Sequence, residues 1–173
     1  TGLANLNAES YYAVYPHSAT NACTSAGVLT VNIPAQQTAV AGGFASGANV
    51  SVAAWQNAEM SSENGIIFNN VCSLLSFGFE TDADAILTKS VTVKMKNETG
   101  YINIAGNVSV SYNPEGDLVV SEGTTDNIVL TAPTGGFAKG VTYYVLVAPV
   151  GQTAEMELTY THTDGTTTCT RKN

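Results

Sequence analysis

Apolar and polar residues alternate with a period of two in segment after segment of this 173-residue chain. In residues 90–96, two valines and a methionine alternate with threonine and lysine. In residues 155–162, methionine, leucine and tyrosine alternate with glutamate and threonine. Successive side chains of a β-strand point to opposite faces of a sheet, so this pattern predicts strands with one buried and one solvated face. Such strands must cover their apolar faces, which restricts the chain to sheets packed against one another.

Shorter or more apolar segments complete the expected set of strands. They are residues 11–15, 28–33, 49–55, 71–79, 107–112, 117–121, 127–131 and 141–148. Segment 71–79 is apolar on both faces near Cys72 and Leu74, so we expect it to be covered from both sides there. Shared parity within the strands predicts a core. This core comprises Val71, Leu75, Phe77, Val91, Val93, Val108, Val110, Val145, Val147, Met156 and Leu158.

Composition and turn signals agree with an all-β chain. Threonine and valine suit pleated sheets, glycine, asparagine and serine suit turns, and lysine and arginine together number six. Four turn signals lie between expected strands: Asn64-Gly65, the string NPEG at residues 113–116, Thr134-Gly135-Gly136 and Asp164-Gly165. The last should close a tight hairpin into a final strand at residues 166–170. We therefore expect strand and turn throughout.

The length accommodates one large β-sandwich or two small ones packed together. Either arrangement buries a core without needing disulfides or a structural metal. The polar residues 56–63 are the best candidate for a linker. We place a boundary at Gly65, which divides the chain into residues 1–64 and residues 65–173.

Charge and hydropathy exclude several classes of function. The net charge is −8 and the sequence pI is about 4.4, with no basic patch. Such a surface repels nucleic acid and anionic membranes, so we expect neither as a partner. No stretch approaches the length of a membrane span. The low-charge, threonine-rich composition is typical of proteins outside the cell.

The three cysteines, Cys23, Cys72 and Cys169, lack the C-x-x-C spacing of metal or redox sites. We expect Cys72 to be buried, unpaired and inert, because it lies inside an apolar segment. Its replacement by serine should then lower stability without affecting function. Whether Cys23 and Cys169 pair remains open.

Candidate catalytic and metal-binding groups are sparse. His17 lies beside Pro16, and His162 lies two residues before Asp164, an aspartate that we interpret as a turn residue. Asp82 and Asp84 carry oxygens that suit calcium, but no glycine or distal glutamate follows in register, so a solvated acidic loop is favoured. We therefore expect no catalytic residue, no metal and no cofactor.

Aromatic and asparagine residues give weaker signals. Six aromatic side chains are candidates for a sugar-stacking platform, although aromatic residues on strands more commonly pack in or beside a core. They are Tyr11, Tyr12, Tyr15, Trp55, Tyr143 and Tyr144. Asn49, Asn97 and Asn107 each begin an Asn-x-Ser/Thr triplet, which a threonine-rich chain produces by chance.

The order of several short strings is more specific than any one of them. The strings are YYAVYP at residues 11–16, LTVNIPAQQT at 29–38, GFASGAN at 43–49, VAA at 52–54, FNNVCSLLSF at 68–77, IAGNVSV at 104–110 and YYVLVAP at 143–149. Over residues 11–164, their order and spacing resemble the fimbrillin-like proteins of gut and oral Bacteroidetes.

The resemblance implies two transthyretin-like or immunoglobulin-like β-sandwich domains. Residues 1–64 would be the remainder of an incomplete N-terminal domain, and residues 65–173 the C-terminal one. It also implies an outer-membrane-anchored precursor at the cell surface, and assembly into type V pili or display as a tip adhesin. The expected partners are other pilus subunits, copies of the chain, and a host surface protein or glycan. Relatives carry strands before residue 11 and after residue 164, so we expect a fragment or processed form whose missing strand comes from another chain.

Two other functions compete with a structural or adhesive pilus subunit. A cell-surface carbohydrate-binding module would need exposed aromatic residues on one flat face, whereas a pilin needs an unpaired strand edge. An enzyme acting on polysaccharides would need paired carboxylates in a cleft, and the sequence indicates no such pair. We therefore expect a non-enzymatic surface subunit.

Overall fold

The computed structural model describes residues 10–56, 66–151 and 155–172. Strands make up 53% of it and helix 4%, so the fold is all-β, as the period-two pattern predicts. The strands are β1 (Ser10–Tyr15), β2 (Ala22–Cys23), β3 (Leu29–Ile33), β4 (Gln36–Thr38), β5 (Ser51–Gln56), β6 (Asn69–Asn70), β7 (Ser73–Phe77), β8 (Thr88–Asn97), β9 (Gly100–Ile102), β10 (Gly106–Tyr112), β11 (Leu118–Val120), β12 (Asn127–Thr131), β13 (Tyr143–Val147), β14 (Glu155–His162) and β15 (Thr167–Lys172). One short helix, α1 (Asp82–Leu87), lies among these described elements.

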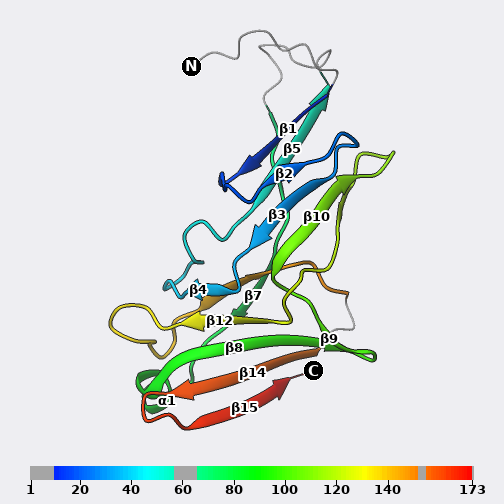
Figure 1. Ribbon diagram of the computed structural model, residues 1–173. Helices are drawn as coiled ribbons and strands as arrows, with labels where there is room; N and C mark the ends of the chain where they lie inside the picture. Colours follow the sequence, from blue (N-terminus) through cyan, green and yellow to red (C-terminus); the bar gives the residue numbers. More distant parts are fainter. Residues whose placement is uncertain (1–9, 57–65, 152–154, 173) are drawn as a thin grey trace.

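The upper part of the molecule in Figure 1 consists of two facing sheets, which we call the small sandwich. One sheet has the strand order β1-β5-β6 and the other has the order β11-β10-β3-β2. Apolar side chains from both sheets form one buried cluster between them. Its members are Leu29, Val31, Ile33, Val50, Val52, Val71, Val108, Val110 and Ala148.

The lower part, which we call the large sandwich, places a six-stranded sheet against a two-stranded one. The larger sheet has the order β15-β14-β8-β12-β4, with β9 on β8, and the smaller sheet is β13-β7. Strand β4 joins β12 in parallel, and the other paired strands described are antiparallel. Between the sheets, valines of β8 and β13 and several aromatic side chains form one buried cluster. The most buried aromatic residues there are Phe79, Phe137 and Tyr143.

The core expected from strand parity is confirmed. Eight of its eleven residues are buried, and Leu75, Phe77 and Met156 are half-buried and packed against the large cluster. The expectation that segment 71–79 is covered on both faces is wrong at Leu74, which is 50% exposed. Ala45 and Ala48 form a cluster with Leu146 and Cys72 that does not include Leu74. The residues that cover this face therefore do not extend as far as the Leu74 side chain of β7.

The expected acidic loop at Asp82 and Asp84 is instead the first turn of α1. Thr81 caps the helix: its hydroxyl accepts a hydrogen bond from the Asp84 backbone N–H at 3.1 Å and donates one to the Asp84 carboxylate at 2.6 Å. The first of these bonds satisfies one of the N–H groups that a helix start leaves free, and the second holds the Thr81 hydroxyl in place. The prediction of strand and turn throughout fails here because a Thr-x-x-Asp pattern precedes an Ala-Ile-Leu run.

The expected hairpin at Asp164-Gly165 joins β14 to β15 and is confirmed. Asp164 accepts a hydrogen bond from the Thr166 backbone N–H at 2.8 Å, and Gly165 adopts the left-handed φ of 86° that such a turn favours. The turn at residues 113–116 likewise joins β10 to β11. The predicted turn at Asn64-Gly65 and the linker at residues 57–63 lie outside the described residues.

Hydrogen bonding joins the segments on the two sides of Gly65. Strand β3 pairs with β10, and strand β4 pairs with β12. Each sandwich therefore combines strands from residues 1–64 with strands from residues 65–173.

Candidate functional site

The two-stranded sheet of the large sandwich is much narrower than the sheet that it covers. Strands β13 and β7 face a six-stranded sheet across one core. Leu75 and Phe77 of β7, and Met156 and Tyr160 of β14, are only half-buried against that core. The margins of the large sandwich therefore leave apolar side chains in partial contact with solvent.

A buried glutamine closes the edge of this small sheet on the β13 side. Gln37 is only 3% exposed. Its Nε2 donates to the carbonyl oxygen of Leu146 at 2.7 Å and to that of Pro34 at 3.0 Å, and its Oε1 accepts from the Leu146 N–H at 3.1 Å. The carboxamide thus occupies the place of a peptide group from a neighbouring strand.

The opposite edge of the sheet belongs to β7, which has no further strand beside it among the described residues. Leu146 lies opposite Leu74 in the ladder. Because the N–H and C=O of Leu146 point away from β7 toward Gln37, those of Leu74 must point away from β13. Residues 66–79 also contain no Asp, Glu, Lys, Arg or Pro. An uncharged free edge of this kind is a template for an added strand.

The small sandwich has edges that are equally unprotected by charge. No Asp, Glu, Lys or Arg occurs in residues 10–58. Its seven strands, including the edge strands β1, β2, β6 and β11, carry no charged side chain. Natural sheets commonly protect their edges with charged residues, lysine above all.

A cavity of about 250 Å³ lies between two of these edge strands, β1 and β2. Tyr12 and Val14 of β1 line it together with Cys23 of β2 and Leu29 of β3, and the connection between β1 and β2 also contributes to its wall. The small sandwich is therefore incompletely filled between its sheets at this edge.

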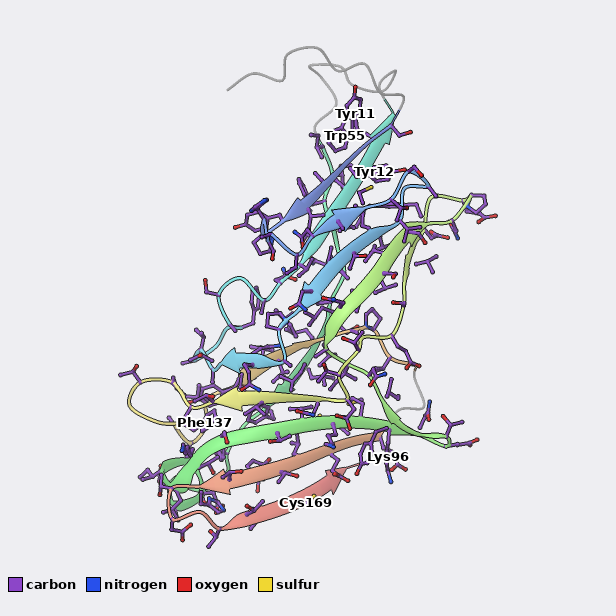
Figure 2. All side chains as sticks on the ribbon, in the orientation of Figure 1. Tyr11, Tyr12, Trp55, Lys96, Phe137 and Cys169 are labelled. Atoms are coloured by element: carbon purple, nitrogen blue, oxygen red, sulfur yellow. The ribbon has the colours of Figure 1, made fainter. Side chains whose placement is uncertain are left out.

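The six aromatic candidates do not form one platform. Tyr11 and Trp55, which are paired across β1 and β5, stack with ring centroids 5.8 Å apart. Tyr12 points from the other face of β1, because successive side chains alternate. Tyr143 is buried in the large core, and Tyr144 is half-buried. Figure 2 shows Tyr11, Tyr12 and Trp55 together at the upper end of the small sandwich.

The titratable candidates are separated in the structure. His17 lies at the cavity, whereas His162 lies at the β14–β15 hairpin. The interpretation of Asp164 as a turn residue is confirmed, and hydrogen bonds from Thr166 lower the pKa of its carboxyl group. Within the part of the chain that the structure describes, no three His, Cys, Asp or Glu side chains are grouped to hold a metal ion.

The three cysteines are free thiols in this structure. Cys23 and Cys169 are exposed and lie in different sandwiches. Cys72 is half-buried rather than fully buried, and its thiol lies 3.7 Å from the carbonyl oxygen of Ala48. Burial raises the pKa of the Cys72 thiol, which disfavours its reactive thiolate form.

No helix among the described residues is long and apolar enough to cross a membrane. Comparison of the chain with protein-family models found no match, and comparisons with curated proteins and with solved structures found none either. Two features of the described residues offer a place for a partner: the free edge of β7 and the cavity beside β1.

Proposed function

We propose that this chain is a structural or adhesive subunit of a bacterial surface pilus, similar to the fimbrillins, that assembles by accepting a β-strand from a neighbouring subunit. The neighbour is another pilus subunit or a copy of this chain, and the chain acts at the cell surface without catalysis. The proposal includes a transthyretin-like or immunoglobulin-like topology for its sandwiches. The observation that carries it is the free, uncharged edge of β7 in a sheet too narrow for the core that it covers.

Both hydrogen bonds and apolar contacts would stabilise a strand added beside β7. It would pair the outward N–H and C=O groups of Leu74, each bond contributing about 1 kcal/mol net. It would also cover Leu74 and the margin near Leu75 and Phe77, where fully burying one such side chain contributes about 1.5–3 kcal/mol. Apolar cover is therefore the larger contribution, and the hydrogen bonds fix the register.

Strand addition at β7 is tested by placing a charge on the edge. Leu74→Lys should abolish self-assembly or subunit exchange of the purified chain, because a lysine on an edge strand would be desolvated by an incoming strand. Ile86→Lys is the matched control, because Ile86 is 70% exposed on α1, away from any strand edge. Size-exclusion chromatography with light scattering measures the species formed. Assembly that Leu74→Lys leaves unchanged, or a strictly monomeric parent chain, would contradict this mechanism.

A second variant tests the backbone directly. Ser76 shares the outward orientation of Leu74, since it is two residues along β7. Ser76→Pro removes an N–H that does not serve the ladder with β13, so the fold should persist while strand addition is lost. Circular dichroism checks the fold of the variant.

The cellular role is tested by immunoelectron microscopy of cells that produce the chain. Antibody against it should label filaments or their tips at the surface. Label confined to the cell interior would contradict the pilus proposal even if the purified chain assembles.

A further inference from the structure

The cavity between β1 and β2 has a defined aromatic wall. Tyr12 of β1 forms part of its lining and is 37% exposed. Its hydroxyl lies where a side chain on Gly27 would begin, and Gly27 also has a left-handed φ of 76°. A residue with a Cβ at position 27 would therefore both strain the backbone and displace the ring. Glycine at this position allows Tyr12 to occupy its place at the cavity.

The other walls combine apolar side chains with polar ones, and none of the lining residues is Asp, Glu, Lys or Arg. His17, Ser18 and Asn21, from the connection between β1 and β2, supply an imidazole, a hydroxyl and a carboxamide. The Asn21 Nδ2 donates to the Pro16 carbonyl oxygen at 3.4 Å, and the Ser18 hydroxyl lies 2.9 Å from that of Thr20. Both groups are thus oriented by their own neighbours and keep further hydrogen-bonding capacity for a ligand.

Size and chemistry together define the ligand class. The volume of the cavity is about 250 Å³. Pockets for drug-sized ligands typically have volumes of about 300–1,000 Å³, so this cavity suits a smaller ligand with one ring. An aromatic wall suits the C–H face of a sugar ring, while amide and hydroxyl groups suit its hydroxyls. Residues 10–58 contain no Lys or Arg to pair with a carboxylate, sulfate or phosphate. A purely apolar ligand would make no use of the imidazole, hydroxyl and carboxamide of His17, Ser18 and Asn21.

We propose that this cavity binds one neutral pyranose residue of a glycan, with Tyr12 stacking on the ring and Asn21 and Ser18 bonding its hydroxyls. The site is separate from the β7 edge, so it does not depend on the assembly mechanism. It gives the chain an adhesive function of its own.

Ligand-observed saturation-transfer NMR tests the proposal on the whole chain. The probes are methyl β-galactoside, methyl α-mannoside, methyl α-fucoside and N-acetylglucosamine, with the methyl glycoside of N-acetylneuraminic acid as the charged comparator. At least one neutral probe should receive saturation, and the charged one should not. Tyr12→Ala should weaken that binding by about ten-fold, the scale of one aromatic contact. Tyr15→Ala is the matched control, because Tyr15 is the same residue type on the opposite face of β1 and is 67% exposed.

The native thiols give a second measurement that needs no variant. Cys23 lines the cavity, whereas the exposed Cys169 lies in β15 at the far end of the molecule from Tyr12 (Figure 2). The bound neutral glycoside should slow alkylation of Cys23 by iodoacetamide and leave the rate at Cys169 unchanged. Peptide mass spectrometry separates the two sites.

Three results would each overturn the proposal. The first is that none of the neutral glycosides binds. The second is that Tyr15→Ala weakens binding as much as Tyr12→Ala. The third is equal slowing of Cys23 and Cys169 alkylation, or none at Cys23, at a concentration that saturates the NMR signal. If Tyr12→Ala does not fold, Asn21→Ala replaces it with the same expected direction.

Discussion

The two sandwiches differ most in how their polar surfaces are built. The strands of the small sandwich carry no Asp, Glu, Lys or Arg side chain. Amide pairs such as Asn32–Asn107, at 2.9 Å, join its neighbouring strands. The large sandwich instead carries ion pairs on its outer face, between Lys94 and Asp126 at 3.0 Å and between Lys96 and Glu155 at 3.3 Å.

This difference indicates which surfaces of the molecule can bind a partner. Charged pairs across β8, β12 and β14 oppose another sheet on that face, because docking would remove their charges from water. An uncharged surface with free edges carries no such penalty. The open cavity lies in the small sandwich. In the large one, the free edge of β7 is likewise uncharged and lies in the narrow sheet, away from the ion pairs.

The two sandwiches nevertheless share strands at their junction. Val71, just before β7, and Ala148, just after β13, belong to the small core, while β7 and β13 themselves cover the large one. Loss of one core should therefore be transmitted to the other.

Phe137→Ala should produce the largest effect, about 3–5 kcal/mol of lost stability, because it empties a site in the large core. The Phe137 ring lies 4.9 Å from those of Phe79 and Tyr143, measured between centroids. Urea unfolding followed by fluorescence of Trp55, the single tryptophan, reports on the small sandwich. Its midpoint should fall together with that of circular dichroism. A Trp55 midpoint that stays in place would show that the two sandwiches unfold independently.

Gln37→Ala should cost about 2–3 kcal/mol, because it leaves a buried N–H and C=O of Leu146 without partners. The residue lies in β4, so it links the six-stranded sheet of the large sandwich to the β13 edge of the narrow sheet. Gln36→Ala is a matched control, because Gln36 is its exposed neighbour in the same strand. Chemical denaturation of both variants checks the expectation, which equal effects would contradict.

Asp126→Asn should have the smallest effect, below about 1 kcal/mol, because the pair that it forms with Lys94 is partly exposed to solvent. Hydrogen bonds from Asn127 and then Lys94 lower the pKa of the Asp126 carboxyl group. A lowered folded-state pKa stabilises the fold above the ordinary aspartate pKa of about 3.9, and that contribution disappears as pH falls through the folded-state pKa. The stability difference from the parent chain should therefore shrink as the solution is acidified.

The small sandwich supplies the control for that pH dependence. Asn107→Ala removes the Asn32–Asn107 amide pair, which has no titrating group. Its effect on stability should stay constant over the same pH range. A pH-dependent effect there would contradict the electrostatic contrast between the two sandwiches.

Strand parity predicted the buried side chains of strands that are polar on one face. Val91 and Val93 are buried, and their neighbour Thr92 is half-buried. Strand parity did not predict the exposure of Leu74. The outer face of β7 is covered only near Cys72, by the loop around Ala45 and Ala48, and this loop is remote in sequence. The helix was missed although its Thr81–Asp84 capping pattern was present. For the site, the sequence identified Tyr12 and His17 as candidates but not the cavity that brings them together.

The all-β class, most of the core and the hairpins follow from the sequence alone, because strand parity and turn chemistry are local properties of the chain. The sequence also shows that residues 10–58 contain no Asp, Glu, Lys or Arg. Which strands are neighbours depends on the tertiary fold, since pairing such as β3 with β10 joins residues far apart in sequence. The tertiary fold also places Gln37 against one edge of the narrow sheet and leaves β7 at the other edge. A strand is an edge strand only if no other strand pairs with its outer side, and local sequence does not show this.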